Sequence, residues 1–306
     1  MTFTRKIADD IYLIDANMYS IPGFASVYLV AAEKPVLIET GLPTSAETIL
    51  SGLRQIGVSP ADIAYIMVTH VHIDHAGGAG TLLAHMPCAQ VLAHEKGAKH
   101  LVNPVKLNAA MGELSGGTAL AQGNSMVPIA ADRVRAVKDG EVVELGGGHN
   151  LEVIYSPGHA RHHLCIYDMK HKALFTGDAA GIAFHDENVL IPATPPPDFD
   201  LELSINSVRR LMEQDVQLLL FSHFGVTRKV RETLEKVIRK LQLWGDITRA
   251  AAEEGSLEKV VDRLRVEVQR ELAPLASRKD LCQYQEAVIL PLSASGYISY
   301  FAKKGK

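Results

Sequence analysis

The sequence of 306 residues is poor in cysteine: it has only Cys88, Cys165 and Cys282, which lie far apart. Cysteines without a C-x-x-C pair indicate neither a disulfide framework nor a zinc finger. A run of apolar residues long enough to span a bilayer is also missing, and the first residues lack the apolar core of a signal peptide. We therefore expect a cytoplasmic protein without a membrane partner.

A surplus of positive charge is missing as well. The chain has 31 Lys and Arg against 35 Asp and Glu, which gives a net charge of −4. Proteins that wrap nucleic acids usually carry a positive surplus, so we expect no nucleic-acid partner. The hydrophobic fraction of 47% is that of an ordinary globular protein, whereas the 13 histidines are unusual.

Strand and helix patterns alternate over the first 225 residues, which predicts an α/β domain. Residues 25–41 are typical of a hairpin that turns at Glu33-Lys34-Pro35, and residues 44–57 of a helix. This helix is expected to begin with a capping box of Thr44 and Glu47 and to end at Gly57. Further strands are predicted at 64–69, 89–95, 142–145, 151–156, 163–168, 172–177 and 216–222. Residues 103–132 are expected to form a loop or short helices, and the proline-rich residues 191–200 no regular structure.

The chain after His223 has a helical pattern of apolar residues. Helices are predicted over 226–241, 257–272 and 279–304, the last disturbed at Pro291 and Gly296. We therefore expect an α/β domain at residues 1–225 and a helical extension at residues 226–306 that packs on it.

Four potential metal ligands, His70, His72, Asp74 and His75, lie within six positions at the end of the strand predicted over 64–69. A catalytic metal ion needs imidazole and carboxylate ligands that converge on one point. Open α/β sheets bind ligands just beyond such strand ends. A solvated loop rarely carries four such residues, so this segment predicts a metal site.

Three further candidates stand at the ends of other apolar strands: His159, Asp178 and His223. Taken alone, each of them could be a residue that caps a turn or a histidine satisfied by a hydrogen bond. Their equivalent positions at strand ends favour a single site shared with the first four residues.

Five segments in this order, VLIETG, THVHIDHAGG, SPGHARHH, LFTGDAAG and FSHFG, resemble the metallo-β-lactamase superfamily. The resemblance implies an αββα sandwich with a metal site on one edge, made by residues 1–225. It also implies that the first metal ion is held by His70, His72 and His159, the second by Asp74, His75 and His223, and that Asp178 bridges the two.

The resemblance further implies a dinuclear metal-dependent hydrolase. A hydroxide shared by two divalent ions would attack an ester-type carbonyl, most often that of a thioester or a lactone. Zinc is the expected metal, although iron and manganese accept the same ligands. Asp74 and Asp178 are the expected catalytic residues. The apolar loop at residues 181–200 should line the cleft, which favours a small-molecule substrate with an apolar or acyl portion.

Several histidines and one glutamate are assigned supporting roles or none. Glu39 stands where many members of the family have aspartate, and we expect it to accept a hydrogen bond from a metal-site histidine. His163 is expected to support the site without binding metal. No function is assigned to His85, His94, His100, His149, His171 and His185.

Alternatives remain open at this point. An iron-dependent oxidoreductase similar to persulfide dioxygenases has the same fold, as do phosphodiesterases and RNA-processing nucleases. β-Lactam hydrolysis fits less well, because those enzymes are usually secreted, and a binding protein without turnover fits least. The helical extension either shapes the substrate pocket, as in glyoxalase II-like members, or forms a homodimer interface.

Overall fold

The computed structural model describes residues 3–114, 123–184, 189–252 and 256–305. The chain divides into two compact units. The first unit consists of Met1–Tyr155 and Leu164–Phe175, and the second of Ser156–His163 and Thr176–Lys306. The domain boundary expected near residue 225 stays a prediction.

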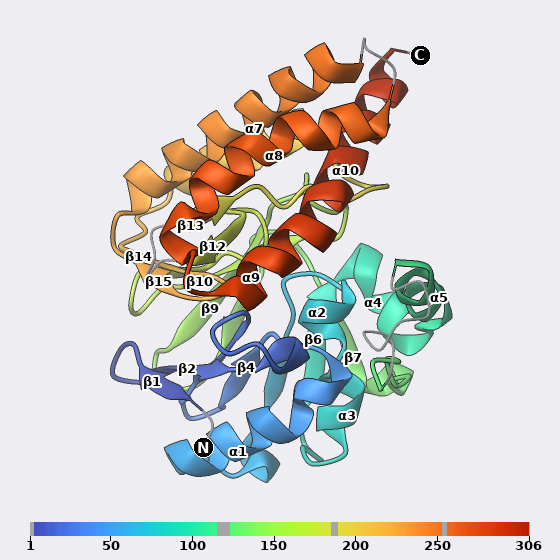
Figure 1. The fold of residues 1–306 in the computed structure, drawn as a ribbon. Helices are drawn as coiled ribbons and strands as arrows, with labels where there is room; N and C mark the ends of the chain where they lie inside the picture. Colours follow the sequence, from blue (N-terminus) through green and yellow to red (C-terminus); the bar gives the residue numbers. More distant parts are fainter. Residues whose placement is uncertain (1–2, 115–122, 185–188, 253–255, 306) are drawn as a thin grey trace. The chain divides into compact units, whose positions relative to one another are not determined.

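The first unit contains a seven-stranded sheet in which the strands follow one another in chain order (Figure 1). Strands β1 to β4 pair antiparallel, and β4 to β7 pair parallel. Short, wholly apolar strands such as β4 and β5 are typical of the buried middle of a sheet. The strands are β1 (Thr4–Lys6), β2 (Ile11–Asp15), β3 (Ser26–Val30), β4 (Val36–Ile38), β5 (Tyr65–Met67), β6 (Gln90–His94) and β7 (Val134–Val137). The predicted hairpin is confirmed as β3 and β4, with Tyr28 opposite Ile38.

Four more strands of the first unit form an antiparallel meander. They are β8 (Val142–Glu144), β9 (Asn150–Tyr155), β10 (Leu164–Asp168) and β11 (Ala173–Phe175). Phe175 on β11 meets Tyr28 on β3 edge-on, with ring centroids 5.2 Å apart. The meander therefore packs on the seven-stranded sheet through apolar side chains, and the core of the unit lies between them.

The helices of the first unit are α1 (Ala46–Ile56), α2 (Ile73–Ala76), α3 (Ala79–Leu83), α4 (Glu95–Val102) and α5 (Val105–Leu114). Helix α1 packs tightly on β2, since a Cβ atom on Gly52 would lie 2.5 Å from Cγ2 of Ile14. Gly57 ends α1 at φ +90°, as predicted. The capping box was wrong: the Thr44 hydroxyl donates to the side chain of Asn124 instead, at 2.8 Å. Within residues 103–132, α5 is one of the short helices expected, and residues 115–122 lie outside the described residues.

The second unit contains two short antiparallel strand pairs: β12 (Ile182–Phe184) with β13 (Val189–Ile191), and β14 (Leu218–Leu220) with β15 (Val226–Thr227). The segment 181–200 was expected to be a loop, but its two apolar stretches bury their side chains by pairing with each other. Residues 192–200 are irregular, as their prolines predict. Residues 185–188, including His185, lie outside the described residues.

Helices make up most of the second unit, and those after residue 229 run from orange to red in Figure 1. The helices of this unit are α6 (Leu201–Met212), α7 (Val230–Ala252), α8 (Leu257–Leu272), α9 (Lys279–Tyr284) and α10 (Leu290–Lys304). Helices α7, α8 and α10 pack on one another around buried Trp244 and Tyr297. None of the helices in the described residues is long and apolar enough to cross a membrane.

The irregularity predicted in the last helix is real but lies elsewhere. Gln285–Ile289 form a π-helical turn between α9 and α10, and Pro291 follows it in the first turn of α10. Gly296 does not break the helix. A Cβ atom there would lie 1.8 Å from the carbonyl oxygen of Thr194, so the glycine allows α10 to contact the chain beside β13.

Candidate metal centre

The segment between β5 and α3 carries the first group of predicted ligands. His70 follows β5, His72 precedes α2, and Asp74 and His75 lie in α2 itself. Nε2 of His70 and Nδ1 of His72 are 2.9 Å apart, so two imidazole nitrogens converge on one point. His70 and His75 are buried, whereas the side chain of Asp74 is 29% exposed.

Glycines bring this segment against the loop after β4. A Cβ atom on Gly78 would lie 2.5 Å from the carbonyl oxygen of Thr40. The backbone N–H of Thr40 donates to the carbonyl of His75 at 2.8 Å, as does its hydroxyl. These hydrogen bonds attach helix α2 to the loop that contains Glu39.

Glu39 orients His75. Its Oε1 accepts a hydrogen bond from Nδ1 of His75 at 3.0 Å and another from the Thr69 hydroxyl at 2.5 Å. A carboxylate only accepts, so Nδ1 of His75 carries the proton and Nε2 is the nitrogen that faces Asp74, 3.6 Å away. The hydrogen bond expected of Glu39 is confirmed, and the metal-binding role of His75 stays a prediction. Its backbone has φ +68°, a conformation that residues other than glycine rarely adopt and that occurs often at functional sites.

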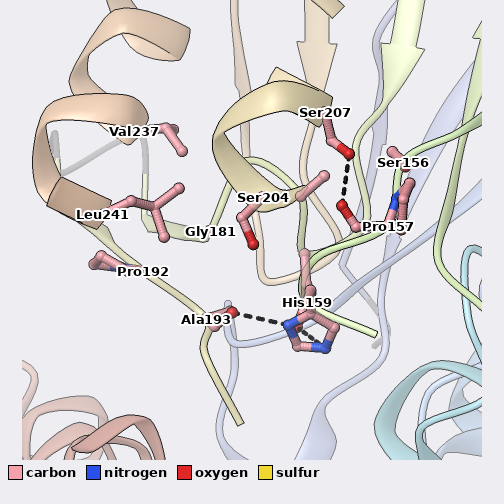
Figure 2. Close-up of a pocket in the computed structure, with 12 residues that line it drawn as sticks. Ser156, Pro157, His159, Gly181, Pro192, Ala193, Ser204, Ser207, Val237 and Leu241 are labelled. Atoms are coloured by element: carbon pink, nitrogen blue, oxygen red, sulfur yellow. Dashed lines mark hydrogen bonds and ion pairs between the residues drawn. The ribbon is translucent and has the colours of Figure 1, made fainter. Parts of the chain in front are cut away.

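The second group of predicted ligands lies in the second unit. His159, Asp178 and His223 are all buried. Nδ1 of His159 donates to the carbonyl of Ala193 at 2.9 Å (Figure 2), which directs Nε2 towards Oδ2 of Asp178 at 3.4 Å. Nε2 of His223 lies 3.5 Å from the other oxygen, Oδ1. Asp178 therefore presents one oxygen to each histidine, as a bridging ligand requires.

Two close backbone contacts place His159. The neighbouring Gly158 has φ +137°, and a Cβ atom there would lie 2.3 Å from the backbone nitrogen of Ser204. The carbonyl of Gly158 also accepts the N–H of Asp200, which is the N-cap of α6. The His159 turn is thereby held at the start of that helix, and only glycine fits there.

His163 holds the backbone of Asp178 in place through a hydrogen bond. Its Nε2 accepts the backbone N–H of Asp178 at 3.0 Å, which requires the ring to carry its proton on Nδ1. Nδ1 lies 2.9 Å from the Ser156 hydroxyl, whose oxygen can accept a hydrogen bond from the Nδ1–H group. His163 is fully buried and both ring nitrogens are engaged, so it positions the site, as expected for a residue that is not a ligand.

These side chains suit divalent metal ions. Metal-binding histidines usually donate one ring N–H to a carboxylate or a carbonyl and bind the ion through the other nitrogen. His75, with Glu39, and His159, with the carbonyl of Ala193, are held in this way. Each unit thus contributes candidate ligands, and the joining of all seven residues into one dinuclear centre stays a prediction.

A pocket opens beside the second group of predicted ligands (Figure 2). His159 and Asp178 line one part of it, and Val237 and Leu241 of α7 line another. Gly181, Pro192 and Ala193 also line it, as expected for the segment 181–200. Sequence patterns missed Ser204, Ser207, Val237 and Leu241, since each of them occupies the buried face of an ordinary amphipathic helix.

Comparison with known proteins places the chain in a family. The profile of the metallo-β-lactamase superfamily matches residues 20–223. Among relatives, the metallo-β-lactamase fold-containing protein ST1585 of Sulfurisphaera tokodaii is 32% identical over 79% of this chain and 90% of its own length. Human acyl-coenzyme A thioesterase MBLAC2 is 29% identical over 74% and 84%, respectively. The N-acyl homoserine lactonase of Bacillus cereus is 26% identical over 69% and 84%.

Solved structures agree. The crystal structure of archaeal ST1585 has a TM-score of 0.63 at 30% identity and covers 76% of this chain and 86% of its own. A metallo-β-lactamase family protein from Thermus thermophilus, TTHA1429, has a TM-score of 0.70 at 18% identity, over 98% of this chain and 95% of its own. The predicted fold class, an αββα sandwich with C-terminal helices, is confirmed. The chain belongs to the metallo-β-lactamase superfamily.

Proposed function

We propose that this protein is a metal-dependent hydrolase that cleaves an ester-type carbonyl, a thioester or a lactone, in a small molecule with an apolar acyl portion. The observation that carries the proposal is the pocket in which His159 and Asp178 lie beside Val237 and Leu241. Predicted metal ligands and apolar side chains line the same space. The relatives named as a thioesterase and a lactonase support the same reaction class.

Two divalent ions, zinc in the first place, would be held by His70, His72, His159, Asp74, His75, His223 and the bridging Asp178. When bound, they would lower the pKa of a shared water and polarise the scissile carbonyl. Asp74 is the half-buried carboxylate of the set. In this proposal it also orients that water, and it would pass a proton taken up from the water to the leaving group.

Glu39, His163 and the carbonyl of Ala193 hold the ligands in place. Glu39 keeps the proton of His75 on Nδ1, and Ala193 does the same for His159. His163 fixes the backbone of Asp178. Because these contacts exist before any substrate binds, the ligand atoms need little rearrangement during the reaction.

The acyl portion of the substrate is assigned to the α7 side of the pocket. Val237 and Leu241 are 3% and 4% exposed, so an acyl chain that contacts them is removed from water. Ser204 and Ser207 line the pocket too, but their hydroxyls already donate to the carbonyls of Asp200 and Pro157. The apolar wall is therefore the part of the pocket that selects the substrate.

The test measures hydrolysis of acyl thioesters and acyl lactones of increasing chain length by the native protein and by Val237→Thr. Threonine has the shape of valine, so the variant mainly adds a hydroxyl to the wall. We expect KM for long acyl chains to rise about 3- to 10-fold, with kcat and short substrates little changed. Val266→Thr is the matched control, because Val266 lies on α8 and is 58% exposed.

An equal effect of Val237→Thr on short and long substrates would refute the acyl assignment. Absence of hydrolysis of both substrate classes by the zinc-loaded protein, together with oxygen uptake in the presence of iron and a persulfide, would replace the proposal with the oxidoreductase alternative.

A further inference from the structure

Three residues without an assigned function in the sequence, Asp10, His149 and His171, meet in the first unit. Asp10 directly precedes β2, His149 directly precedes β9, and His171 lies in the turn between β10 and β11. One carboxylate oxygen and one nitrogen of each ring lie within 4.8 Å of one another. None of these residues belongs to the predicted dinuclear centre, so the cluster is separate in composition from the proposed active site.

His149 is held in a defined orientation. The ring is 3% exposed, and its Nε2 lies 2.8 Å from Oδ2 of Asp168, a carboxylate with no exposed surface. The other oxygen of Asp168 accepts the backbone N–H groups of Lys170 and His171 at 2.9 and 3.0 Å. Asp168 thereby fixes both the His149 ring and the turn that carries His171.

The ring nitrogen of His149 that does not contact Asp168, Nδ1, faces Asp10. Nδ1 of His149 is buried, has no hydrogen-bond partner among the described residues and lies 3.4 Å from Oδ2 of Asp10. With the proton on Nε2, Nδ1 and the carboxylate oxygen would face each other as two acceptors, which repel. A cation between them removes the conflict. That cation is either a second proton on the ring or a metal ion.

Asp10 is an ionised ligand at neutral pH. Burial alone would raise the pKa of its carboxyl, but hydrogen bonds from Lys170 and His171 outweigh burial and hold the pKa below the ordinary value of 3.8. Nε2 of His171 is in hydrogen-bond contact with Oδ1, and the Lys170 ammonium lies 2.5 Å from Oδ2. The Lys170 side chain is 49% exposed on a flexible stem, so it can turn away into solvent.

We propose that Asp10, His149 and His171 bind a zinc ion. Two imidazole nitrogens and one carboxylate oxygen are ligands that zinc accepts, with water in the fourth position. The contact of His149 with Asp168 is the carboxylate–histidine pair that commonly supports such sites. Binding displaces the Lys170 ammonium from Oδ2 of Asp10.

The site has a structural consequence. Asp10 directly precedes strand β2 of the seven-stranded sheet, and His149 and His171 lie in the turns of the meander that packs on it. A zinc ion there cross-links the two layers of the first unit. Because the unfolded chain does not hold the three ligands together, zinc stabilises the folded state.

The test is a zinc titration of the metal-free full-length protein against a chromophoric chelator, with the unfolding temperature recorded alongside. The native protein should bind one zinc ion more than His171→Gln, and that ion should raise the unfolding temperature. Asp168→Asn should weaken it about 10- to 100-fold. Lys170→Met should strengthen it, because the competing ammonium is removed. His85→Gln is the control, since that histidine is exposed and belongs to none of the clusters.

Zinc binding at this site is measured as the difference in bound zinc between the native protein and His171→Gln. The result therefore does not depend on the predicted dinuclear centre or on its activity. Identical titrations for the native protein, His171→Gln and Lys170→Met would overturn the proposal. If His171→Gln does not fold, Lys170→Met decides alone: tighter zinc binding supports the site, and unchanged binding refutes it.

Discussion

Nδ1 of His75 donates a 3.0 Å hydrogen bond to Oε1 of Glu39 in a fully buried contact. This one contact decides which nitrogen of His75 faces Asp74 and is available to a metal ion. The backbone of Glu39 is left-handed, with φ +68°. The two residues come from the loop after β4 and from α2, so they also hold these segments together.

The first prediction concerns Glu39. Glu39→Gln retains the size of the side chain but replaces the ionised acceptor that serves His75 and Thr69. We expect the affinity for the metal ion at His75 to fall about 10- to 100-fold. A competition titration with zinc and a chelator measures the change. Glu47→Gln, at an exposed position on α1, is the control, and equal affinities of the two variants would count against the orienting role.

The second prediction concerns His163, which accepts the backbone N–H of Asp178. His163→Ala leaves that N–H buried without its acceptor, so zinc affinity and kcat should fall together. His163→Gln can again present an acceptor near the position of Nε2 and should recover a large part of the loss. If His163 has only a structural role, His163→Ala and His163→Gln should lose stability and zinc affinity to the same extent, without recovery by glutamine. Calorimetry of the zinc-free proteins separates the two cases.

A third prediction follows from Glu271 on α8. Burial raises the pKa of its carboxyl, but hydrogen bonds from Lys236, Lys240 and the N–H of Leu190 outweigh burial and lower it from the ordinary value of 4.5. A carboxyl with a lowered folded-state pKa stabilises the protein above its unfolded-state pKa, and this contribution is lost as the pH falls. Glu271→Gln should therefore reduce the free energy of unfolding by about 2 kcal/mol at neutral pH.

The difference between Glu271→Gln and the native protein should shrink as the pH falls below 4.5. Denaturant unfolding at several pH values measures it. Glu235→Gln is the control, because Glu235 is an exposed partner of Arg231 on α7 and should matter by less than about 0.5 kcal/mol. A pH-independent loss in Glu271→Gln would mean that packing, not charge, is the cause.

The fourth prediction concerns the attachment of α10. Gly296→Ala would place a methyl group 1.8 Å from the Thr194 carbonyl oxygen, next to Ala193, which lines the pocket and holds His159. The overpacking should lower the free energy of unfolding by about 1–3 kcal/mol or more. Gly112→Ala, in α5 with open space around it, should instead be neutral or stabilising by up to about 1 kcal/mol. Thermal unfolding of the two variants provides the comparison.

The sequence predicts what neighbouring residues encode. His70, His72, Asp74 and His75 are recognisable because the four potential ligands lie within six positions. Strands β3 and β4 are recognisable as short apolar runs, and α1 by the glycine that ends it, Gly57. The role of Glu39 follows from the family resemblance. Contacts between distant residues are not visible in this way. Thr44 bonds Asn124 rather than capping α1, and Asp10, His149 and His171 come from three turns without a shared pattern. The pocket residues on α7 look like any buried helix face.

The most direct test of the central claim is zinc titration of the metal-free protein while thioester and lactone hydrolysis are followed. We expect no turnover without metal, recovery when about two equivalents are bound besides the ion held by Asp10, His149 and His171, and, in Asp178→Ala, loss of turnover together with the ions of the dinuclear centre. Hydrolysis that persists in the metal-free protein, or full activity and metal content in Asp178→Ala, would contradict the claim.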